Sequence, residues 1–394
     1  MFEALQAQPP DKIFALMQAY REDPRESKID LGEGVYKDAS GLTPIMGAVK
    51  TAEQMSWEAQ DTKVYTSFIG DPAFGDALRD LVLGSAVPAG AVAFAGTPGG
   101  TGACRQAFEF VKLANPSARV FVSNPTWPNH LSILEYLGQD IGSYRYFDSE
   151  SRAVDFDGML DDLRQARRGD VVLLLGCCHN PTGANLNLTQ WQDVVAVLQE
   201  TGAVPVIDIA YQGFGEGLEA DAAGTRLVAS SVPECLIAAS CSKNFGIYRE
   251  RTGILMVVSH DAKATSLSQQ TLFFLNRQNY SFPPDHGARL VTMIWNDATL
   301  RAQWQTELED TRLGMLDLRQ QLADTLQRLS GSDQYGFLAQ HRGMFSRLGI
   351  GPDMVERLRV KHGIYMLGDS RVNIAGLNAQ TVPVLAEALV AEGI

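Results

Sequence analysis

The segment around Lys243 carries the residue types best suited to chemistry. Lys243 follows the apolar run 236–239 and is flanked by the hydroxyls of Ser240 and Ser242, with Arg251 further on. An apolar setting beside a cation lowers the pKa of a lysine and gives the neutral amine that attacks a carbonyl. Hydroxyls and a guanidinium suit a phosphate. The segment therefore predicts a site for a phosphorylated aldehyde, although a lone loop lysine is more often only solvated.

Two further turns carry groups that suit the same kind of ligand. Gly100 and Thr101 lie in a glycine-rich turn before a helix expected to start near Ala103, where backbone N–H groups attract an anion. Trp127 follows another apolar run on a proline-rich turn, and its ring suits stacking on a planar cofactor. The alternatives are a tight turn without a ligand and a tryptophan that fills a domain interface.

Three polar residues follow or interrupt apolar runs in the middle of the chain. Asp208 lies inside the run 204–209, where a carboxylate is costly unless it is paired. A protonated pyridine nitrogen would be a suitable partner, and the pairing would make the ring a better electron sink. Asn180 and Tyr211 could donate to a ring oxygen. A plain turn at Asn180 and an Asp208 held by backbone N–H groups are the alternatives.

Two arginines predict carboxylate binding. Arg371 begins an apolar, strand-like run, and Arg277 lies in a polar stretch before Pro283 and Pro284. A guanidinium binds a carboxylate through two parallel hydrogen bonds, and amino acids and dicarboxylates carry such groups. A surface position is the alternative for each arginine.

Alternating patterns predict the elements that position these residues. Short apolar runs lie at 91–95, 119–123, 171–175, 204–209, 235–239 and 254–258, with helical patterns at 103–114, 129–137, 157–167 and 189–201. Such alternation indicates an α/β fold with a mainly parallel sheet, whose sites gather at the carboxyl ends of the strands. We expect an arm at 1–10, a large domain at 44–310, and a smaller α+β domain formed by 11–43 and 311–394, with one long helix over about 300–330.

Composition restricts the class of protein. The chain has 394 residues, 45% of them hydrophobic, and a net charge of −13. This charge argues against nucleic acids and anionic membranes as partners, because both need a basic surface. The five cysteines and six histidines show no metal-binding spacing, so no metal is expected. No secretion signal is evident, and the five cysteines form no even framework of disulfides, which together indicate a cytoplasmic protein.

Taken together, these motifs resemble the aspartate and aromatic aminotransferase family of fold-type I pyridoxal-phosphate enzymes. The resemblance runs from the loop at 31–36 to the motif at 370–373, and it includes the segment 343–346. It rests on the Ser-x-Ser-Lys motif with its downstream arginine, the Asn-Pro-Thr-Gly motif and the Asp-x-x-Tyr motif, in that family's order along the chain.

The resemblance implies a role for each candidate residue. Lys243 would form the Schiff base with pyridoxal 5'-phosphate and then move the proton at the substrate α-carbon. Asp208 would pair with the ring nitrogen, and Trp127 would stack on the ring. The remaining cofactor contacts would come from Asn180 and Tyr211 at the ring oxygen, and from Gly100, Thr101, Ser240, Ser242 and Arg251 at the phosphate.

The resemblance also implies a homodimer with shared active sites. Arg371 would bind the substrate α-carboxylate, with Gly34, Trp127 and Asn180 beside the substrate. Tyr65 would reach the phosphate from the partner subunit, and Arg277, also from the partner, would bind a distal carboxylate.

Three residues depart from the family pattern, one in the phosphate turn and two beside the substrate. Gly99 stands where the family often has serine, and Phe282 and Val64 stand where aspartate-specific members have small or polar residues. Because the last two make the pocket more apolar, we expect aromatic amino acids, and also aspartate or glutamate, as donors, with 2-oxoglutarate as acceptor in a ping-pong reaction.

Three alternatives remain at this point. The chain could be an aspartate aminotransferase with little aromatic activity. It could be a pyridoxal-phosphate lyase or decarboxylase, against which the pair Arg277 and Arg371 speaks. It could be a non-catalytic relative, against which Lys243, Asp208 and Tyr211 speak.

Overall fold

The computed structural model describes residues 1–7 and 11–394. Contacts between Cα atoms divide the chain into two compact units, one formed by Met1–Thr43 with Met315–Ile394 and the other by Pro44–Gly314. The predicted domain boundary near residue 44 lies beside the first break, and the predicted boundary at 310 lies four residues before the second. The Pro9–Pro10 end of the predicted arm lies outside the described residues.

A seven-stranded sheet forms the centre of the Pro44–Gly314 unit in the described part of the chain, in the order β2-β10-β9-β8-β7-β3-β4. Its strands are β2 (Val92–Pro98), β3 (Arg119–Asn124), β4 (Asp140–Arg145), β7 (Val171–Leu175), β8 (Val204–Ile209), β9 (Glu234–Ser240) and β10 (Thr252–Ser259). β10 runs antiparallel to both its neighbours, while the other pairs are parallel. The predicted α/β class with a mainly parallel sheet is confirmed.

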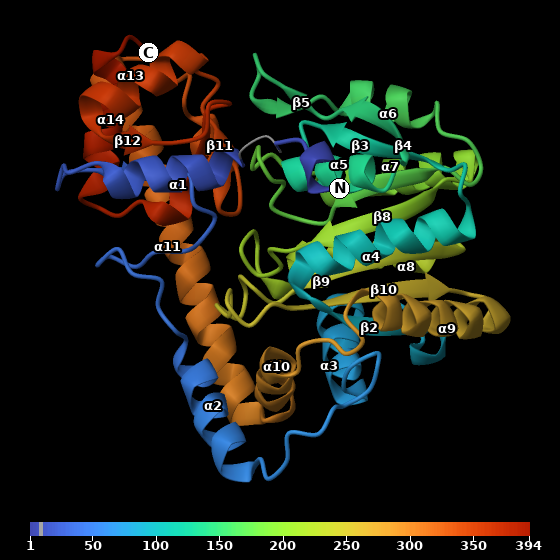
Figure 1. Ribbon diagram of the computed structural model, residues 1–394. Coiled ribbons are helices and arrows are strands. Elements are labelled where there is room, and N and C mark those ends of the chain that lie inside the picture. The colour runs from blue at the N-terminus through green and yellow to red at the C-terminus, as the bar shows by residue number, and fades with distance from the viewer. Residues whose placement is uncertain (8–10) are drawn as a thin grey trace. The chain divides into compact units, whose positions relative to one another are not determined.

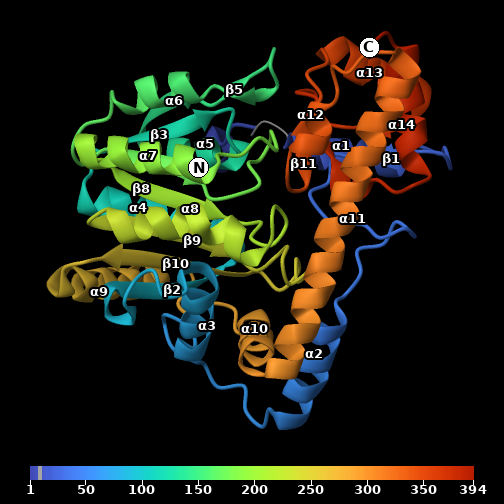
Figure 2. The same cartoon turned by 180° about the vertical axis from the view of Figure 1, so that it is seen from behind.

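Helices cover both faces of this sheet. Figures 1 and 2 show α4 on one face, with α7 and α8 on the opposite face. The helices of the unit are α2 (Gly47–Ala59), α3 (Pro72–Leu83), α4 (Gly99–Ala114), α5 (Pro128–Tyr136), α6 (Phe156–Leu163), α7 (Leu188–Thr201), α8 (Leu218–Ser231), α9 (Ala262–Asn279), α10 (His286–Asn296) and the first part of α11 (Ala298–Ser330). A short turn η2 (Ala89–Ala91) and a small hairpin of β5 (Phe147–Asp148) and β6 (Ala153–Val154) complete it.

Two details of the unit differ from the sequence expectation. The strand β2 continues to Pro98 and α4 starts at Gly99, four residues before the expected start near Ala103. The helix therefore begins inside the glycine-rich turn, so Gly100 and Thr101 belong to its first turn. The edge strand β4 was not expected, because Asp140–Arg145 has no apolar run.

The other unit is smaller and mixes short strands with helices. Its elements are η1 (Phe2–Ala4), α1 (Lys12–Glu22), β1 (Ile29–Asp30), the second part of α11, α12 (Phe337–Gln340), β11 (Phe345–Arg347), α13 (Pro352–His362), β12 (Ile364–Tyr365), β13 (Arg371–Asn373), η3 (Ile374–Gly376) and α14 (Thr381–Ala391). Asp11 accepts a hydrogen bond from Phe14 N at 2.8 Å and caps α1, as its position before the helix predicts. β1 pairs with β12, so the N-terminal segment packs on a core that includes Leu31, Leu326 and Leu385.

An ionic cluster at the end of α14 ties that helix to α13. Glu392 lies 3.0 Å from His362 Nε2, 2.6 Å from Arg357 Nε and 3.1 Å from Lys361 Nζ. These contacts from His362, Arg357 and Lys361 lower the pKa of Glu392 from 4.5 to about 2.

This ionic cluster predicts that part of the free energy of unfolding is lost at acidic pH. A carboxyl whose folded pKa is depressed stabilises the fold above its unfolded pKa, and the contribution disappears as the pH falls through the folded value. The stability difference between the wild type and Glu392→Gln should therefore be present above the ordinary pKa of 4.5 and should shrink as the pH falls from 4.5 to 2. Urea unfolding midpoints across this range measure it, and a difference that persists unchanged at pH 2 would contradict the assignment.

Candidate active site

The predicted site residues of the sheet gather where its parallel strands end. Gly100 follows β2, Trp127 follows β3, Asn180 follows β7 and Tyr211 follows β8. Ser242 and Lys243 follow β9. Arg251 precedes β10, which runs the opposite way, so it lies at the same edge. Six strands thus place the predicted site residues at one edge of the sheet, which is where ligands bind in sheets of this type.

Lys243 lies in a tight turn after β9 and is partly buried. Its Nζ lies 5.0 Å from the centre of the Tyr211 ring. Burial, and to a lesser extent the charge of Arg251, lower the pKa of Lys243, while the charge of Asp208 opposes the shift. The result is an amine that loses its proton more readily than an exposed lysine does, as a nucleophile requires.

The turn that carries Lys243 is held from α11. Trp304 is fully buried, donates from Nε1 to the carbonyl of Asn244 at 2.7 Å, and stacks on Phe245 with ring centres 4.4 Å apart. The sequence analysis did not identify Trp304, because its position 60 residues beyond Asn244 shows no local signal. Its contacts fix the turn next to Lys243.

Asp208 forms a buried pair with His130. His130 Nε2 lies 3.1 Å from Asp208 Oδ2, and His130 Nδ1 lies 2.8 Å from Thr126 Oγ1. His130 is fully buried and Asp208 is 8% exposed. The expectation that Asp208 needs a partner is thus met on one side by an imidazole that the sequence analysis had not assigned. Thr126 and His130 stand four residues apart, just after the apolar run 119–123. This spacing is the sequence signal that could have indicated a role for His130 in the site.

Asn180 and Tyr211 lie together, as predicted. The Asn180 side chain is 5% exposed and its Nδ2 lies 3.5 Å from the Tyr211 hydroxyl. Among the described residues, Asn180 Oδ1 is buried without a hydrogen-bond partner. An uncompensated buried amide oxygen is costly, so this atom points to a donor that the chain alone does not provide.

The hydroxyls and the guanidinium form a compact cluster at the start of α4. Arg251 Nη1 lies 3.4 Å from Ser242 Oγ, and Ser242 N donates to Ser240 Oγ at 3.2 Å. A Cβ added at Gly99 would lie 2.6 Å from the Arg251 guanidinium, and one at Gly100 would lie 3.0 Å from Ser240 Cβ. Gly99 also has φ +71°, which favours glycine. The departure at Gly99 therefore has a steric reason, because a side chain there would displace the arginine.

Arg371 and Gly34 belong to the other unit and are described within it. The Arg371 side chain is 3% exposed, donates from Nη2 to the carbonyl of Gly32 at 2.7 Å, and lies with Cζ 4.3 Å from the centre of the Phe345 ring. A Cβ on Gly34 would lie 3.3 Å from the same ring. The loop at 31–36 and the two strands β11 and β13 thus place a buried guanidinium beside a glycine.

A second cluster in the large unit consists of Tyr65, Phe68, Arg277 and Phe282, and we call it the aromatic stack. Phe282 stacks between Tyr65 and Phe68, with ring centres 4.5 Å apart on each side. Arg277 Cζ lies 5.0 Å from the centre of the Phe68 ring, and its Nη1 donates to Ser281 Oγ at 2.6 Å. Among the described residues, neither Tyr65 nor Arg277 forms a hydrogen bond with Lys243 or with the cluster of Ser240, Ser242 and Arg251. Tyr65 is 76% exposed.

Within the described part of the chain, two groups of side chains have a spacing compatible with a metal ion: Cys104, His130 and Asp208, and Cys177, Cys178 and Asp221. The Asp221 carboxylate already accepts hydrogen bonds from the backbone N–H groups of Gly213, Gly215 and Glu216 at 2.8–2.9 Å. This explains why Asp221 is buried without invoking an ion.

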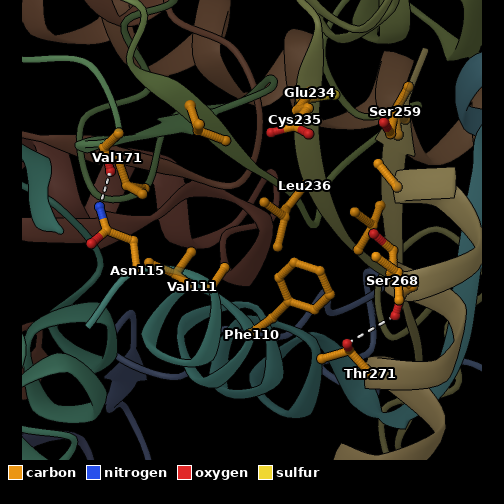
Figure 3. Close-up of a pocket in the computed structure, with 17 residues that line it drawn as sticks. Phe110, Val111, Asn115, Val171, Glu234, Cys235, Leu236, Ser259, Ser268 and Thr271 are labelled. Carbon is orange, nitrogen blue, oxygen red and sulfur yellow. Dashed lines mark hydrogen bonds between the residues drawn. The ribbon is translucent and has the colours of Figure 1, made fainter. Parts of the chain in front are cut away.

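A cavity of about 470 Å³ lies at the other end of the sheet (Figure 3). It is lined by the first residues of three strands, Val171, Val204 and Glu234, and by α4 and α9. Two of its polar side chains, Asn115 and Thr271, already donate to backbone carbonyls at 3.0 and 2.9 Å. Glu234, Ser259 and Ser268 also line it.

No helix of residues 1–7 and 11–394 is long and apolar enough to cross a bilayer.

Comparison with known proteins agrees with this geometry. Residues 26–389 match the model of the family described as aminotransferase class I and II. The chain is 58% identical to an aromatic-amino-acid aminotransferase of Paracoccus denitrificans over the whole of both chains. It is 42% identical to an aspartate aminotransferase of Escherichia coli, over 99% of this chain and all of that one.

Solved structures give the same picture. An aromatic amino acid aminotransferase with 3-indolebutyric acid superposes with a TM-score of 0.98 at 58% identity, covering all of both chains. An aromatic-amino-acid aminotransferase from Burkholderia pseudomallei, described as covalently bound to pyridoxal phosphate, has a TM-score of 0.97 at 37% identity, covering all of this chain and 99% of that one. The predicted family is confirmed, and this chain belongs to the class I and II aminotransferases.

Proposed function

We propose that this chain uses pyridoxal 5'-phosphate to move the amino group of aromatic amino acids, and also of aspartate or glutamate, to 2-oxoglutarate. The observation that carries the proposal is the meeting of the Lys243 amine, the Asp208–His130 pair and the cluster of Ser240, Ser242 and Arg251 at one edge of one sheet. The names of the similar aromatic and aspartate aminotransferases support the two donor classes.

The chain's own residues fit this cofactor. A phosphate would be held by Ser240, Ser242 and Arg251, together with the first N–H groups of α4 at Gly100 and Thr101. The Asn180 side-chain N–H and the Tyr211 hydroxyl lie together, and both can donate to a ring oxygen. Trp127 is partly buried and is a candidate for stacking on the ring.

When bound, pyridoxal phosphate supplies an aldehyde that takes up the amino group and a ring that accepts the electron pair released at the substrate α-carbon. Lys243 removes the proton from that carbon and returns one in the second half of the cycle, which its lowered pKa favours. Asp208 would pair with the ring nitrogen, and His130 would orient that carboxylate. Asn180 and Tyr211 hold the ring oxygen in place.

Arg371 is our candidate for the substrate α-carboxylate, with Gly34, Trp127 and Asn180 as further substrate contacts. Burial of its guanidinium beside Phe345 limits the rotamers of Arg371 and removes competing water. Gly34 leaves backbone room next to the same ring.

We further propose a homodimer in which Tyr65 and Arg277 serve the partner's site. The exposed surface of the large unit supports this, since Trp57, Val64 and Tyr65 are 79%, 79% and 76% exposed. Val64 and Tyr65 are adjacent in the chain, and exposed apolar patches mark interaction surfaces. In sedimentation, the chain of 42.9 kDa should behave as a species of about twice that mass. The five cysteines form no disulfide bond, which supports our proposal of a cytoplasmic location.

The aromatic stack supports aromatic donors. Phe282 lies against Tyr65 and Phe68 and forms apolar surface close to Arg277. Arg277 itself favours the second candidate function, an aspartate aminotransferase with little aromatic activity, because a guanidinium suits a distal carboxylate.

A panel of half-reactions tests the proposal. The cofactor-loaded protein is mixed with phenylalanine, tyrosine, tryptophan, aspartate or glutamate in turn, and its absorbance is followed without an acceptor. Phenylalanine should convert the cofactor to its aminated form and release the matching 2-oxo acid. Negligible conversion by phenylalanine with rapid conversion by aspartate would establish the second candidate. Release of ammonia or carbon dioxide would establish a lyase or decarboxylase.

The carboxylate role of Arg371 gives a further prediction. Arg371→Lys should raise KM for phenylalanine by about 10- to 100-fold, the equivalent of a hydrogen bond to a charged group, because an ammonium cannot form the bidentate pair. The change in kcat should be smaller than the change in KM. Steady-state kinetics with each donor measure both constants, and an unchanged KM would remove Arg371 from this role.

A further inference from the structure

A buried arginine of the smaller unit has no role in the function proposed above. Arg319 belongs to the second part of α11, and its side chain is fully buried. Its Nη2 donates to the carbonyls of Gly343 and Phe345, at 2.8 Å each. Its Nη1 donates to Ser346 Oγ at 2.8 Å and to the carbonyl of Leu338 at 3.1 Å. One guanidinium thus joins α11 to α12, to the segment before β11 and to β11 itself.

A charge in this position is costly unless its hydrogen bonds are well placed. A guanidinium keeps its charge in proteins, and burial removes its hydration. Its rigid fork of N–H groups fits acceptors only at fixed positions, and a lysine does not reproduce that fit. Because one nitrogen binds the carbonyls of both Gly343 and Phe345, Arg319 restrains the path of the backbone between them.

Two neighbouring residues of β11 connect this arginine with Arg371. The Ser346 side chain contacts Arg319. The ring of the preceding residue, Phe345, lies against Arg371, whose Cζ is 4.3 Å from the ring centre. Successive side chains of a strand point to opposite faces, as these two do. Arg319 therefore holds the strand from one face, and the other face presents the Phe345 ring to Arg371.

The loop at 31–36 fixes the surroundings of the same ring. Asn373 Nδ2 donates to two carbonyls of this loop, at 2.7 and 2.8 Å, and Asn373 pairs with Phe345 between β13 and β11. A Cβ on Gly34 would lie 3.3 Å from the Phe345 ring. A displacement of β11 would therefore move the ring relative to both Gly34 and Arg371.

We propose that Arg319 is a positioning residue, which fixes β11 and thereby holds the Phe345 ring against the guanidinium of Arg371. This inference rests on the proposed function for its consequence, because Arg371 is there assigned to the substrate α-carboxylate. Contact with the ring face restricts the plane in which that guanidinium offers two parallel hydrogen bonds. Loss of the restraint should weaken substrate binding and leave the groups of the proton transfer unchanged.

Nuclear magnetic resonance of the cofactor-free protein with labelled arginine tests the arrangement itself. Protons that lie over an aromatic ring resonate at higher field, so the Arg371 side chain carries a signature of the Phe345 ring. Its signal is the one lost in Arg371→Lys, and Phe345→Leu gives its position without the ring. Arg319→Lys should move the Arg371 signal toward that position. A signal that stays in place would overturn the proposal.

A milder variant keeps this test decisive if Arg319→Lys does not fold. Ser346→Ala removes one acceptor of the guanidinium and leaves its charge and the backbone carbonyls in place. The Arg371 signal should move in the same direction as in Phe345→Leu, by a smaller amount. Where only Ser346→Ala folds, an unmoved Arg371 signal in that variant would overturn the proposal.

Steady-state kinetics separate positioning from stability. Arg319→Lys should raise KM for phenylalanine by about 10-fold with a smaller change in kcat, as expected when binding alone is weakened. Its cofactor dissociation constant should match that of the wild type, because the residues assigned to the cofactor lie in the Pro44–Gly314 unit. Leu326→Ala is the matched control. Leu326 is fully buried about two turns further along α11, and its truncation removes core packing but no hydrogen bond of Arg319.

The kinetic outcomes distinguish this inference from the proposed function. If Leu326→Ala raises KM as much as Arg319→Lys does, Arg319 acts through general stability and the proposal is overturned. An unchanged KM in Arg319→Lys, beside a raised KM in Arg371→Lys, would overturn it as well. If neither arginine variant raises KM, the assignment of Arg371 in the proposed function fails instead, and the resonance measurement alone decides on Arg319.

Discussion

Replacement of Lys243 by alanine is expected to lower kcat by about 10,000-fold while the protein still binds pyridoxal phosphate. Lys243 is assigned both the attack on the aldehyde and the proton transfer at the α-carbon, and a positioned acid–base group alone contributes up to about 10,000-fold. Cofactor binding should persist, because Ser240, Ser242 and Arg251 are independent of the lysine side chain. Single-turnover absorbance changes measure the loss, and equilibrium dialysis measures the binding.

Two controls make this result interpretable. Lys263, outside the Lys243 turn and exposed on α9, should be replaceable by alanine without effect on turnover. Borohydride should attach the cofactor to the wild type at position 243 and leave nothing attached in Lys243→Ala. If this variant turns over at a rate near that of the wild type, Lys243 is not the catalytic amine.

Asp208→Asn is expected to lower kcat by about 100- to 1,000-fold, the range for loss of one preorganised electrostatic contact. The amide has nearly the same shape and can still accept a hydrogen bond from His130 Nε2, so the fold should remain intact. What disappears is the negative charge beside the ring nitrogen, and with it the stabilisation of a protonated ring. The absorbance of the bound cofactor as a function of pH reports this change separately from turnover.

Asp221 offers a matched control for Asp208. It is also a buried carboxylate of the large unit, but three backbone N–H groups satisfy it. Asp221→Asn removes a charge from a comparable environment, and we expect it to lower the free energy of unfolding without changing the pH dependence of the cofactor spectrum. If both variants lose activity to the same degree, loss of Asp208 acts through stability and not through the ring nitrogen.

The elements of the large unit could be predicted because their signals are local. Continuous apolar runs mark β7, β8 and β9, and such strands are buried on both faces in a parallel sheet. The edge strand β4 reads Asp-Ile-Gly-Ser-Tyr-Arg, and its exposed residues alternate with more buried ones, so no apolar run exists to find. A continuous apolar run therefore does not mark a strand that has one side facing water.

The residues expected to contact the cofactor could be predicted from the sequence, whereas the residues that support them could not. Lys243, Asp208 and Asn180 stand next to apolar runs, where polar groups are conspicuous. Trp304 lies 60 residues from the turn that it holds, and His130 lies 78 residues from Asp208. Only the folded chain brings such pairs together, so sequence position alone does not reveal them.

The antiparallel direction of β10 makes this edge of the sheet sensitive to insertions and deletions in the loop between β9 and β10. β9 and β10 form a hairpin closed by the hydrogen bond from Cys241 N to the Thr252 carbonyl at 3.0 Å, and its loop carries both Lys243 and Arg251. The distance from amine to guanidinium therefore depends on the length of this loop as well as on the contacts of Trp304 that hold its turn. Insertion or deletion of one residue between 243 and 251 would shift one group against the other, so functional relatives should preserve the length of this interval.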